Sequence, residues 1–513
     1  MMSNPGQVVV IFFLAIFTAI SVRSQDPHGF KTDVILSAIK GTSSKPDTIH
    51  LHPVRTAKDV KISGDQKHLF TWHVPASSSG SKPALVVVFS PPASFTGVAR
   101  AALSGRNFST TLTGLSTKGL EGENEPPLAV IIESLGYSIN PGWTSLQNNL
   151  SPTLHGDELP PSLFKKTNTD NVEMIPVARY SPDFHVNFGY YIIDQSIPRQ
   201  NQVGILATAK EHPEHQVLFP GITKGSQSFD PGTSSFGFYA ISPTHTVYSE
   251  DIWNVLFHPG HAGHGMRIYP VRDKMKVIVP NTFLVCMEEA KNGDYNDYVF
   301  LLKNVTPIPI EADFKSMFNG KNLDGWYKWL QGKGKNNDTD NIFSVAENGL
   351  LHDMGTELGY IMSEKSFRNY HFVLDFKWGV KKWAPRDKMK RDSGICYNIP
   401  EDEPDSIWPQ SVECQIQEGD VGDFWLLNYS TVQVDGKQNS PLQHSQIVKK
   451  ADAEKPNGEW NTVEVISVNG KCVHIVNGTV VNYGENSSLI GGRILLQSEY
   501  AELYYRNIRI REL

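Results

Sequence analysis

A hairpin signal near the C-terminus constrains the fold of this chain more than any other feature. Asn469-Gly470 lies between two apolar, β-branched runs, Val463–Ile466 and Val473–Val476. Asn-Gly is strongly favoured in two-residue hairpin turns, because both central residues must adopt positive φ. Similar runs recur at short intervals before and after it, and evenly spaced antiparallel strands are typical of a sandwich or jelly roll. The other expected strands are Tyr370–Trp378, Ser393–Ile399, Ser411–Gln417, Trp460–Val468 and Arg493–Ser498.

The length of 513 residues suffices for about three domains. With 20% charged and 39% hydrophobic residues, the composition is that of a globular chain. We therefore expect an all-β protein built of consecutive β-sandwich domains. The expected segments are a signal peptide at 1–24, a β-rich region at 25–150, a β-sandwich at 151–307, a linker at 308–312 and a jelly roll at 313–513. In the first region, Leu85–Phe89 and Leu128–Ile132 are expected as buried strands.

The N-terminus has the pattern of an export signal. An apolar run at Val8–Ile20 precedes Val22-Arg23-Ser24, which offers a cleavage site before Gln25. That run is too short to span a bilayer comfortably, and no later stretch is long enough, so no transmembrane segment is expected after signal removal. Sequons begin at Asn107, Asn149, Asn304, Asn337, Asn428, Asn477 and Asn486. These features predict a secreted, extracellular glycoprotein.

Charge and cysteine content exclude some classes of protein. A net charge of −7 gives no reason to expect nucleic acid or an anionic membrane as partner. Four cysteines in so long a chain are too few for a disulfide scaffold. If Asp392 and Glu413 share one sheet face, strand alternation places Cys396 on that face and Cys414 on the other. We therefore expect free, buried thiols.

The chemistry concentrates in Val412–Trp425. Apolar residues alternate there with Glu413, Gln415 and Gln417, and this period of two indicates a strand with one polar face. Asp423 follows in a glycine-bearing turn, just before Trp425. Carboxylates and amides beside an aromatic ring suit a sugar, because hydroxyls need donors and acceptors and the ring stacks on C–H groups. The alternative is an exposed polar strand followed by a turn.

Two metal sites are considered in the middle of the chain. Hard oxygen ligands cluster around a glycine turn at Glu288, Asp294, Asn296 and Asp297, as calcium prefers. The alternative is a hairpin whose side chains bond their own backbone. His258, His261 and His264 recur every third residue in a loop rich in proline and glycine. Three imidazoles could hold zinc, but a plain surface loop is the favoured interpretation there.

Residues 165–307 resemble a domain family of unknown function that occurs in secreted bacterial proteins. The resemblance rests on Phe236–Tyr239, Asn254 and the ending Glu-Glu…Gly-Asp-Tyr-Asn-Asp. Family members end in Glu-Asp…Asp-Tyr-Asn-Asp, and this chain has Glu289 at the position of that first Asp. The resemblance implies an extracellular β-sandwich and no established chemistry.

The last domain resembles the 3-keto-disaccharide hydrolase family. Its motifs are F-N-G-K-N-L-D-G-W at Phe318–Trp326, D-S-G-I at Asp392–Ile395, W-P-Q-S-V-E-C-Q-I at Trp408–Ile416, G-D-V-G-D-F-W-L-L at Gly419–Leu427, G-E-W-N at Gly458–Asn461 and the ending Ile494–Ile508. The resemblance implies a concanavalin-type, lectin-like jelly roll and a hydrolase of 3-keto glycosides. This chain has Asp392 where the family usually has Asn, and the family also includes non-catalytic members.

Such a hydrolase needs a base, an electrophile and an acid. A ketone at C3 acidifies the C2 proton, so a base removes it, the C1 substituent departs and water adds to the enone. A divalent metal could serve as the electrophile. Glu413 is the leading candidate for base or metal ligand, and Glu499 is expected beside it. The other candidates are Asp423 and His444 for catalysis, and Asp392, Gln415, Gln497, Trp408 and Trp425 for binding sugar.

Two functions therefore remain open on the sequence. The first is a secreted carbohydrate-active hydrolase that acts on 3-keto or related glycosides. The second is a non-catalytic extracellular module that binds glycans or matrix. Both predict a carbohydrate as substrate or partner.

Overall fold

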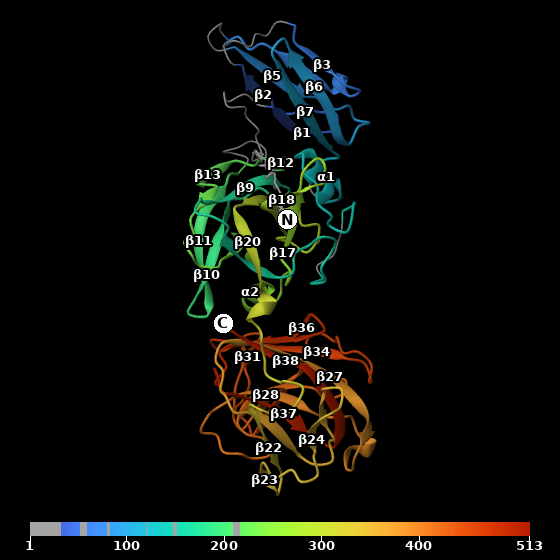
Figure 1. Cartoon of the computed structure of the whole chain (residues 1–513), viewed down its shortest axis with the longest axis vertical. Coiled ribbons are helices and arrows are strands. Elements are labelled where there is room, and N and C mark those ends of the chain that lie inside the picture. The colour runs from blue at the N-terminus through green and yellow to red at the C-terminus, as the bar shows by residue number, and fades with distance from the viewer. Residues whose placement is uncertain (1–31, 52–58, 79–82, 121, 147–150, 209–215) are drawn as a thin grey trace, which may run out of the picture. The chain divides into compact units, whose positions relative to one another are not determined.

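The structure is a computed structural model that describes residues 32–51, 59–78, 83–120, 122–146, 151–208 and 216–513. The expected signal peptide and the sequon at Asn149 lie outside the described residues. The described residues up to 126, with 130–137, form one compact unit, and residues 127–129 with the described residues from 138 to 513 form another (Figure 1). Strands dominate both units, which confirms the predicted all-β class.

The first unit holds two small sheets around one core. The strands of one sheet are β1 (Asp33–Ile39), β7 (Phe108–Thr117), β6 (Gly97–Gly105) and β3 (Lys61–Ser63), in that order. The strands of the other are β2 (Asp47–His50), β5 (Ala84–Phe89) and β4 (Phe70–His73). The run at Leu85–Phe89 is thus a strand, as predicted, and Leu85, Val87 and Phe89 are fully buried in the core.

The apolar run Leu128–Ile132 was wrongly predicted to be a strand. Residues Leu128–Ser134 form helix α1. The buried residues there are Leu128, Ile131, Ile132 and Leu135, which recur at the spacing of a helix and not at that of a strand. Short apolar runs are ambiguous between the two, and here burial of one helical face decides.

Two sheets form the sandwich of the middle domain, which begins the second unit. One has the order β13 (Ile222–Gly225), β11 (Ile197–Leu206), β10 (Val186–Asp194), β15 (Gly237–Ile241) and β16 (Thr246–Tyr248). The other has the order β12 (Val217–Leu218), β9 (Val172–Arg179), β19 (Tyr298–Lys303), β18 (Ile278–Met287) and β17 (Met266–Arg272), and β14 (Ser228–Phe229) also pairs with β9. Helix α2 (Asp251–Phe257) follows β16.

Both expected limits of the middle domain differ from the structure. The segment from Ser138 belongs with the second unit, and Ser138 pairs with Arg272, so the division lies before residue 150. The expected linker is also ordered: β20 (Val305–Pro309) pairs with β8 (Ser162–Lys166), and a 3-10 turn, Ile310–Asp313, follows. Proline is tolerated in β20 because this strand pairs with β8 alone and lies at the edge of its two-stranded ribbon.

The C-terminal domain is a jelly roll of two large antiparallel sheets, drawn in yellow to red in Figure 1. The first sheet has the order β24 (Phe343–Val345), β25 (Leu351–Asp353), β38 (Ala501–Glu512), β27 (Tyr370–Lys382), β34 (Asn461–Val468), β35 (Lys471–Val476) and β36 (Thr479–Gly484), with β21 (Lys315–Ser316) on β38. The second sheet has the order β23 (Gly334–Lys335), β22 (Trp326–Leu330), β26 (Gly359–Ser363), β37 (Arg493–Ser498), β28 (Gly394–Ile399), β29 (Ser411–Gln415), β30 (Phe424–Leu427) and β33 (His444–Ile447). A small ribbon of β31 (Gln433–Val434) and β32 (Lys437–Gln438) lies apart from both.

The predicted hairpin and thiols are confirmed. Strands β34 and β35 pair with Val468 opposite Lys471, and Asn469 and Gly470 have φ of 48° and 80°. All four cysteines are free and buried. Cys414 belongs to the core between the sheets, whereas Cys396 lies in a separate cluster with Tyr360 and Leu427. The two thiols therefore lie on opposite faces of the second sheet.

No helix in the described part of the chain is long and apolar enough to cross a membrane. At five of the described sequons the asparagine amide nitrogen already donates a hydrogen bond, as from Asn428 Nδ2 to Trp408 O at 2.7 Å and from Asn477 Nδ2 to Ala453 O at 2.8 Å; the other three are Asn304, Asn337 and Asn486. Glycosylation and export stay predictions.

Candidate functional site

The candidate site lies on the face of the second jelly-roll sheet that points away from the core. We call this the cavity face. Strand alternation places Val412 and Cys414 in the core and Glu413 and Gln415 on the opposite side, as the sequence predicted. The register sets Glu413 between Cys396 on β28 and Trp425 on β30.

A cavity of about 210 Å³ is hollowed into the cavity face. It brings together eight of the nine residues that the sequence proposed for the C-terminal site, and adds one aliphatic side chain, Leu427. The lining residues are Asp392, Trp408, Glu413, Gln415, Trp425, Leu427, His444, Gln497 and Glu499. Because they come from β29, β30, β33, β37, the turn after β37 and the loops before β28 and β29, only the folded sheet assembles them.

Asp423 is the exception. It does not line the cavity, because the alternation of β29 ends at the turn that precedes β30. Its carboxylate accepts hydrogen bonds from the backbone N–H of Lys449 and from Gln446 Nε2, both at 2.8 Å. These contacts give Asp423 a structural part in holding the neighbouring loop, and we no longer place it among the reacting groups.

Gly394 makes room for the polar groups of the cavity. A Cβ atom at this position would overlap Oε1 of Glu413 and Oε1 of Gln497. The two side chains therefore converge over the bare Cα of Gly394. Gln497 Oε1 has no hydrogen-bond donor among the described residues. A protonated Glu413 carboxyl would supply one.

Arg386 is a site residue that the sequence analysis missed. Its guanidinium forms ion pairs with Asp392 and with Glu499, the latter at 2.7 Å. The residue belongs to a short 3-10 turn, Arg386–Lys388, in the loop between β27 and β28. Sequence gives no signal that singles it out, because Arg386 and Glu499 lie far apart in the chain and several other cations share this loop.

Burial raises the pKa of all three carboxyls in the cavity, and repulsion adds to it at Glu413 and Glu499. Burial, then the charges of Glu499 and Asp392, hold the pKa of Glu413 well above its ordinary value. Burial also raises the pKa of Glu499, to about 8, against the opposing effect of Arg386. The pKa of Asp392 is raised by burial and lowered in part by Arg386. The raised pKa of Glu413 favours its protonated form, and so favours the role of acid over the expected role of base.

Metal binding at either carboxylate cluster stays a prediction. Carboxylates suit hard cations, but no group of three or more His, Cys, Asp or Glu in the described ranges is arranged to hold an ion. In the middle domain, Glu288 accepts backbone N–H groups from Ala290 and Asp294, and Asp297 accepts the N–H of Glu289. These contacts match the alternative, a hairpin whose side chains bond their own backbone. Burial raises the pKa of Asp294 to about 7, with the Glu288 charge adding to it.

The histidine loop is split between two environments. His261 is exposed, and its ring stacks on that of His245 with centroids 4.0 Å apart. His264 is buried between Asp251 and Glu158, each 2.8 Å from one ring nitrogen. Burial alone would lower the pKa of His264, but the two carboxylates raise it to about 9. A buried ion-paired imidazole is neither a plain surface residue nor a free metal ligand.

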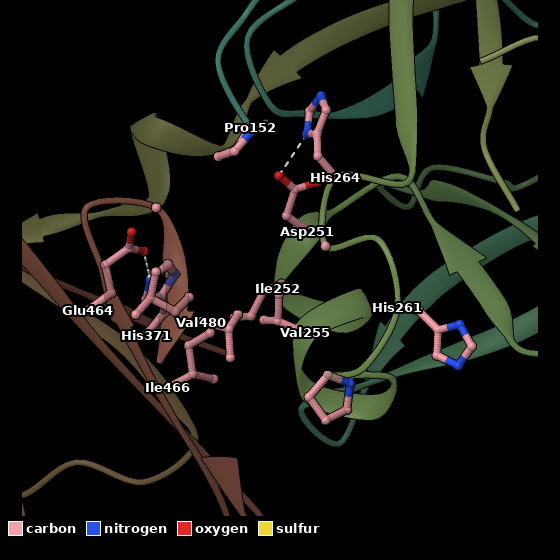
Figure 2. A pocket seen from close by; sticks show the side chains of 14 residues that line it. Pro152, Asp251, Ile252, Val255, His261, His264, His371, Glu464, Ile466 and Val480 are labelled. Carbon is pink, nitrogen blue, oxygen red and sulfur yellow. Dashed lines mark hydrogen bonds and ion pairs between the residues drawn. The ribbon is translucent and has the colours of Figure 1, made fainter. Parts of the chain in front are cut away.

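A second cavity, of about 280 Å³, lies where helix α2 approaches the jelly roll (Figure 2). Two imidazole–carboxylate pairs line it: His264 with Asp251, and His371 with Glu464, whose Nε2 and Oε2 are 2.6 Å apart. Aliphatic side chains lie between the pairs, from Ile252, Val255, Ile466 and Val480. None of its described lining residues is Trp, Tyr or Phe, so it offers no ring on which a sugar could stack.

The family comparison covers the domain that contains the candidate site. Residues 313–511 match the family model of the 3-keto-alpha-glucoside-1,2-lyase-like domain. The C-terminal domain is thus a glycosyl hydrolase-like or carbohydrate-binding jelly-roll module. The two tryptophans and the carboxylates of the cavity belong to this matched segment. No curated protein matches the chain in sequence.

Three solved structures resemble parts of the chain. A candidate glycosyl hydrolase from Parabacteroides distasonis ATCC 8503 is 20% identical, with a TM-score of 0.29 over 40% of this chain and 95% of that chain. A carbohydrate-binding module, CBM66 from Bacillus subtilis, is 10% identical, with a TM-score of 0.25 over 37% and 96%. The β-glucanase of Bacillus licheniformis is 12% identical, with a TM-score of 0.25 over 39% and 97%.

Proposed function

We propose that this chain is a secreted carbohydrate-active hydrolase that cleaves 3-keto or related glycosides by elimination followed by hydration. One observation carries the proposal: three carboxyls, of which Asp392 and Glu413 are buried, converge with two amides and two tryptophan rings in one cavity. Buried carboxyls with raised pKa values are costly to a fold, and such groups concentrate at functional sites. The tryptophans supply the stacking surface and the amides bind hydroxyls.

The electrostatics divide the roles of the carboxyls. Glu499 has a pKa of about 8, close to the range in which a group can both accept and release a proton, so we assign it as the base that removes the C2 proton. The electrons of the C2–H bond then form the C1–C2 double bond as the C1–O bond breaks. Glu413, whose raised pKa favours its protonated form, donates its proton to the leaving oxygen. Water adds to C1 and C2 regains a proton, so the net reaction is hydrolysis.

His444 lies at the exposed side of the same cavity. We propose that it binds the sugar or the departing group there, with Asp392 and Gln415 holding sugar hydroxyls. A divalent cation as the electrophile stays a prediction, and no step here passes through one.

The second candidate is a glycan-binding module without catalysis, and Arg386 is the observation that favours it. Its guanidinium contacts both Asp392 and Glu499, and an ion-paired carboxylate is a weaker base than a free one. A site held in this way can bind a sugar without cleaving it.

Incubation of the pure protein with a 3-keto glucoside and with the matching unoxidised glucoside tests the proposal. We expect sugar release from the keto compound alone, because only its C2 proton is acidic. Loss of release with a chelator would add a metal to the mechanism. No release from either compound, with glycan binding retained, would establish the binding module.

Replacing Arg386 with Met tests whether this residue controls the ionisation of Asp392 and Glu499. Arg386 lowers the pKa values of Asp392 and Glu499, so its removal raises both. Because the base must be ionised, the limb along which activity rises with pH should move to higher pH by about 1–3 units. A pH–rate profile measures this. Lys388→Met, an exposed cation in the same 3-10 turn, is the control. An unshifted limb would remove Arg386 from the site.

A further inference from the structure

The mouth of the cavity continues onto an exposed apolar surface that the proposed function does not use. Tyr429 and Leu442 are 63% and 56% exposed, which is uncommon for side chains of this size. Beyond Leu427 and His444, which line the cavity, the pairing of the two segments continues through Asn428 with Gln443 to Tyr429 with Leu442. The N–H of Tyr429 donates to Leu442 O at 2.9 Å and fixes this pairing.

The backbone at this point is strained. Asn428 and Tyr429 have φ of 47° and 67°, so two successive residues other than glycine adopt the left-handed region. For a bulky side chain such as Tyr429 this is a genuine outlier. Strain of this kind persists only where the surroundings impose it, and it clusters at ligand sites.

Hydrogen bonds from the neighbouring loops hold Asn428 and Tyr429 in this backbone conformation. Asn428 Nδ2 donates to Trp408 O at 2.7 Å, and Gln410 Nε2 donates to Asn428 O at 2.9 Å. The backbone N–H of Asn428 donates to Gln443 O at 2.7 Å. The loop that carries Trp408 into the cavity therefore also holds the turn that exposes Tyr429.

Polar and apolar groups are separated across the site. The carboxyls and amides, Asp392, Glu413, Glu499, Gln415 and Gln497, belong to β28, β29, β37 and their ends. The apolar groups, Trp408, Trp425 and Leu427, lie toward β30 and continue outward to Tyr429 and Leu442. A sugar bound in the polar half with its C1 facing outward would extend its C1 substituent toward the apolar half.

We propose that Tyr429 and Leu442 form a subsite for an apolar, aromatic aglycone, so that the substrates are glycosides of aromatic alcohols and not oligosaccharides. This inference rests on the proposed function for the position of the sugar. An aromatic ring stacks on Tyr429 and covers Leu442, which removes apolar surface from water. A second sugar would instead place hydroxyls against Leu442, whose side chain cannot form hydrogen bonds with them.

Calorimetric titration with unreactive C-glycosides tests the subsite without any need for cleavage. The ligands are the phenyl, methyl and glucosyl C-glycosides of glucose, which share the sugar and differ in the C1 substituent. We expect the phenyl compound to bind about tenfold more tightly than the methyl compound. Tyr429→Asn and Leu442→Ser should each remove most of that preference and leave methyl binding unchanged. Asn tolerates positive φ, so Tyr429→Asn should fold normally.

Ile490→Ser is the control, since Ile490 is 41% exposed and lies beside the β34–β35 turn. Equal binding of the phenyl and methyl compounds, tighter binding of the glucosyl compound, or no binding of any of the three would overturn the proposal. So would a phenyl preference that survives both variants. If the preference behaves as expected but no 3-keto glycoside is cleaved, the subsite stands and the proposed chemistry fails.

Discussion

Glu413→Gln should reduce the release of an alcohol from a 3-keto glucoside by about 10²- to 10⁴-fold, the range in which general acid–base groups contribute. Gln has the shape of a protonated Glu but cannot donate an acidic proton to the leaving oxygen. Because Glu413 is buried and its pKa is raised by burial and by Glu499, the neutral amide should not destabilise the fold. Turnover assays at matched protein concentration, with thermal melting as the check on folding, give the comparison.

The leaving group distinguishes an acid from a base at this position. A nitrophenol departs without protonation, so a nitrophenyl 3-keto glucoside should recover most of the activity lost in Glu413→Gln. Glu499→Gln should not be rescued in this way, because removal of the C2 proton is needed for every leaving group. Equal losses for both leaving groups in Glu413→Gln would contradict the role of acid and return this residue to the role of base.

Gly394→Ala should reduce turnover by about 10²-fold while leaving the reacting groups chemically intact. The added Cβ would overlap the side-chain oxygens of Glu413 and Gln497, so both must move away from the position over this glycine. A displacement of about 1 Å in a catalytic group is enough for such a loss. The backbone of Gly394 is not in the left-handed region, so the effect comes from the side chain alone.

Gly260→Ala provides the matched control, because a Cβ there meets nothing within 4 Å and its φ is also not positive. Comparing kcat/KM and melting temperature for the two variants separates lost geometry from lost stability. Overpacking of this kind costs about 1–3 kcal/mol. Wild-type turnover in Gly394→Ala would mean that Glu413 and Gln497 are free to move without consequence, and that their convergence is not part of a site.

Turn residues and the alternation of apolar and polar residues predicted the jelly roll well, because its strands and its main hairpin follow both patterns. Positive φ at Asn469 and Gly470 and the alternation around Glu413 both agree with the structure. The run at Leu128–Ile132 failed because five apolar residues carry too little periodicity to separate a strand from one turn of helix. The prolines near residue 308 suggested a linker, yet a two-stranded ribbon accommodates them.

The same reasoning found most of the cavity but not its electrostatics. Alternation on β29 and β37 is a local property, so Glu413 and Gln497 could be placed on one face before the fold was known. Arg386 could not, because a loop residue's partners depend on tertiary structure. Asp423 was included for its sequence neighbours, and the turn redirects it to Lys449. The pKa of Glu413 depends on burial and on Glu499, and sequence alone contains neither.

Removal of the C2 proton in this cavity is the step that defines the proposed reaction. Proton NMR of a 3-keto glucoside cleaved by the wild-type protein in D₂O measures it directly. We predict that the released sugar carries deuterium at C2, and that Glu499→Gln abolishes both the exchange and the release. Released sugar that retains its C2 proton would contradict elimination, and a substrate that binds but is neither exchanged nor cleaved would show that the domain recognises glycans without catalysis.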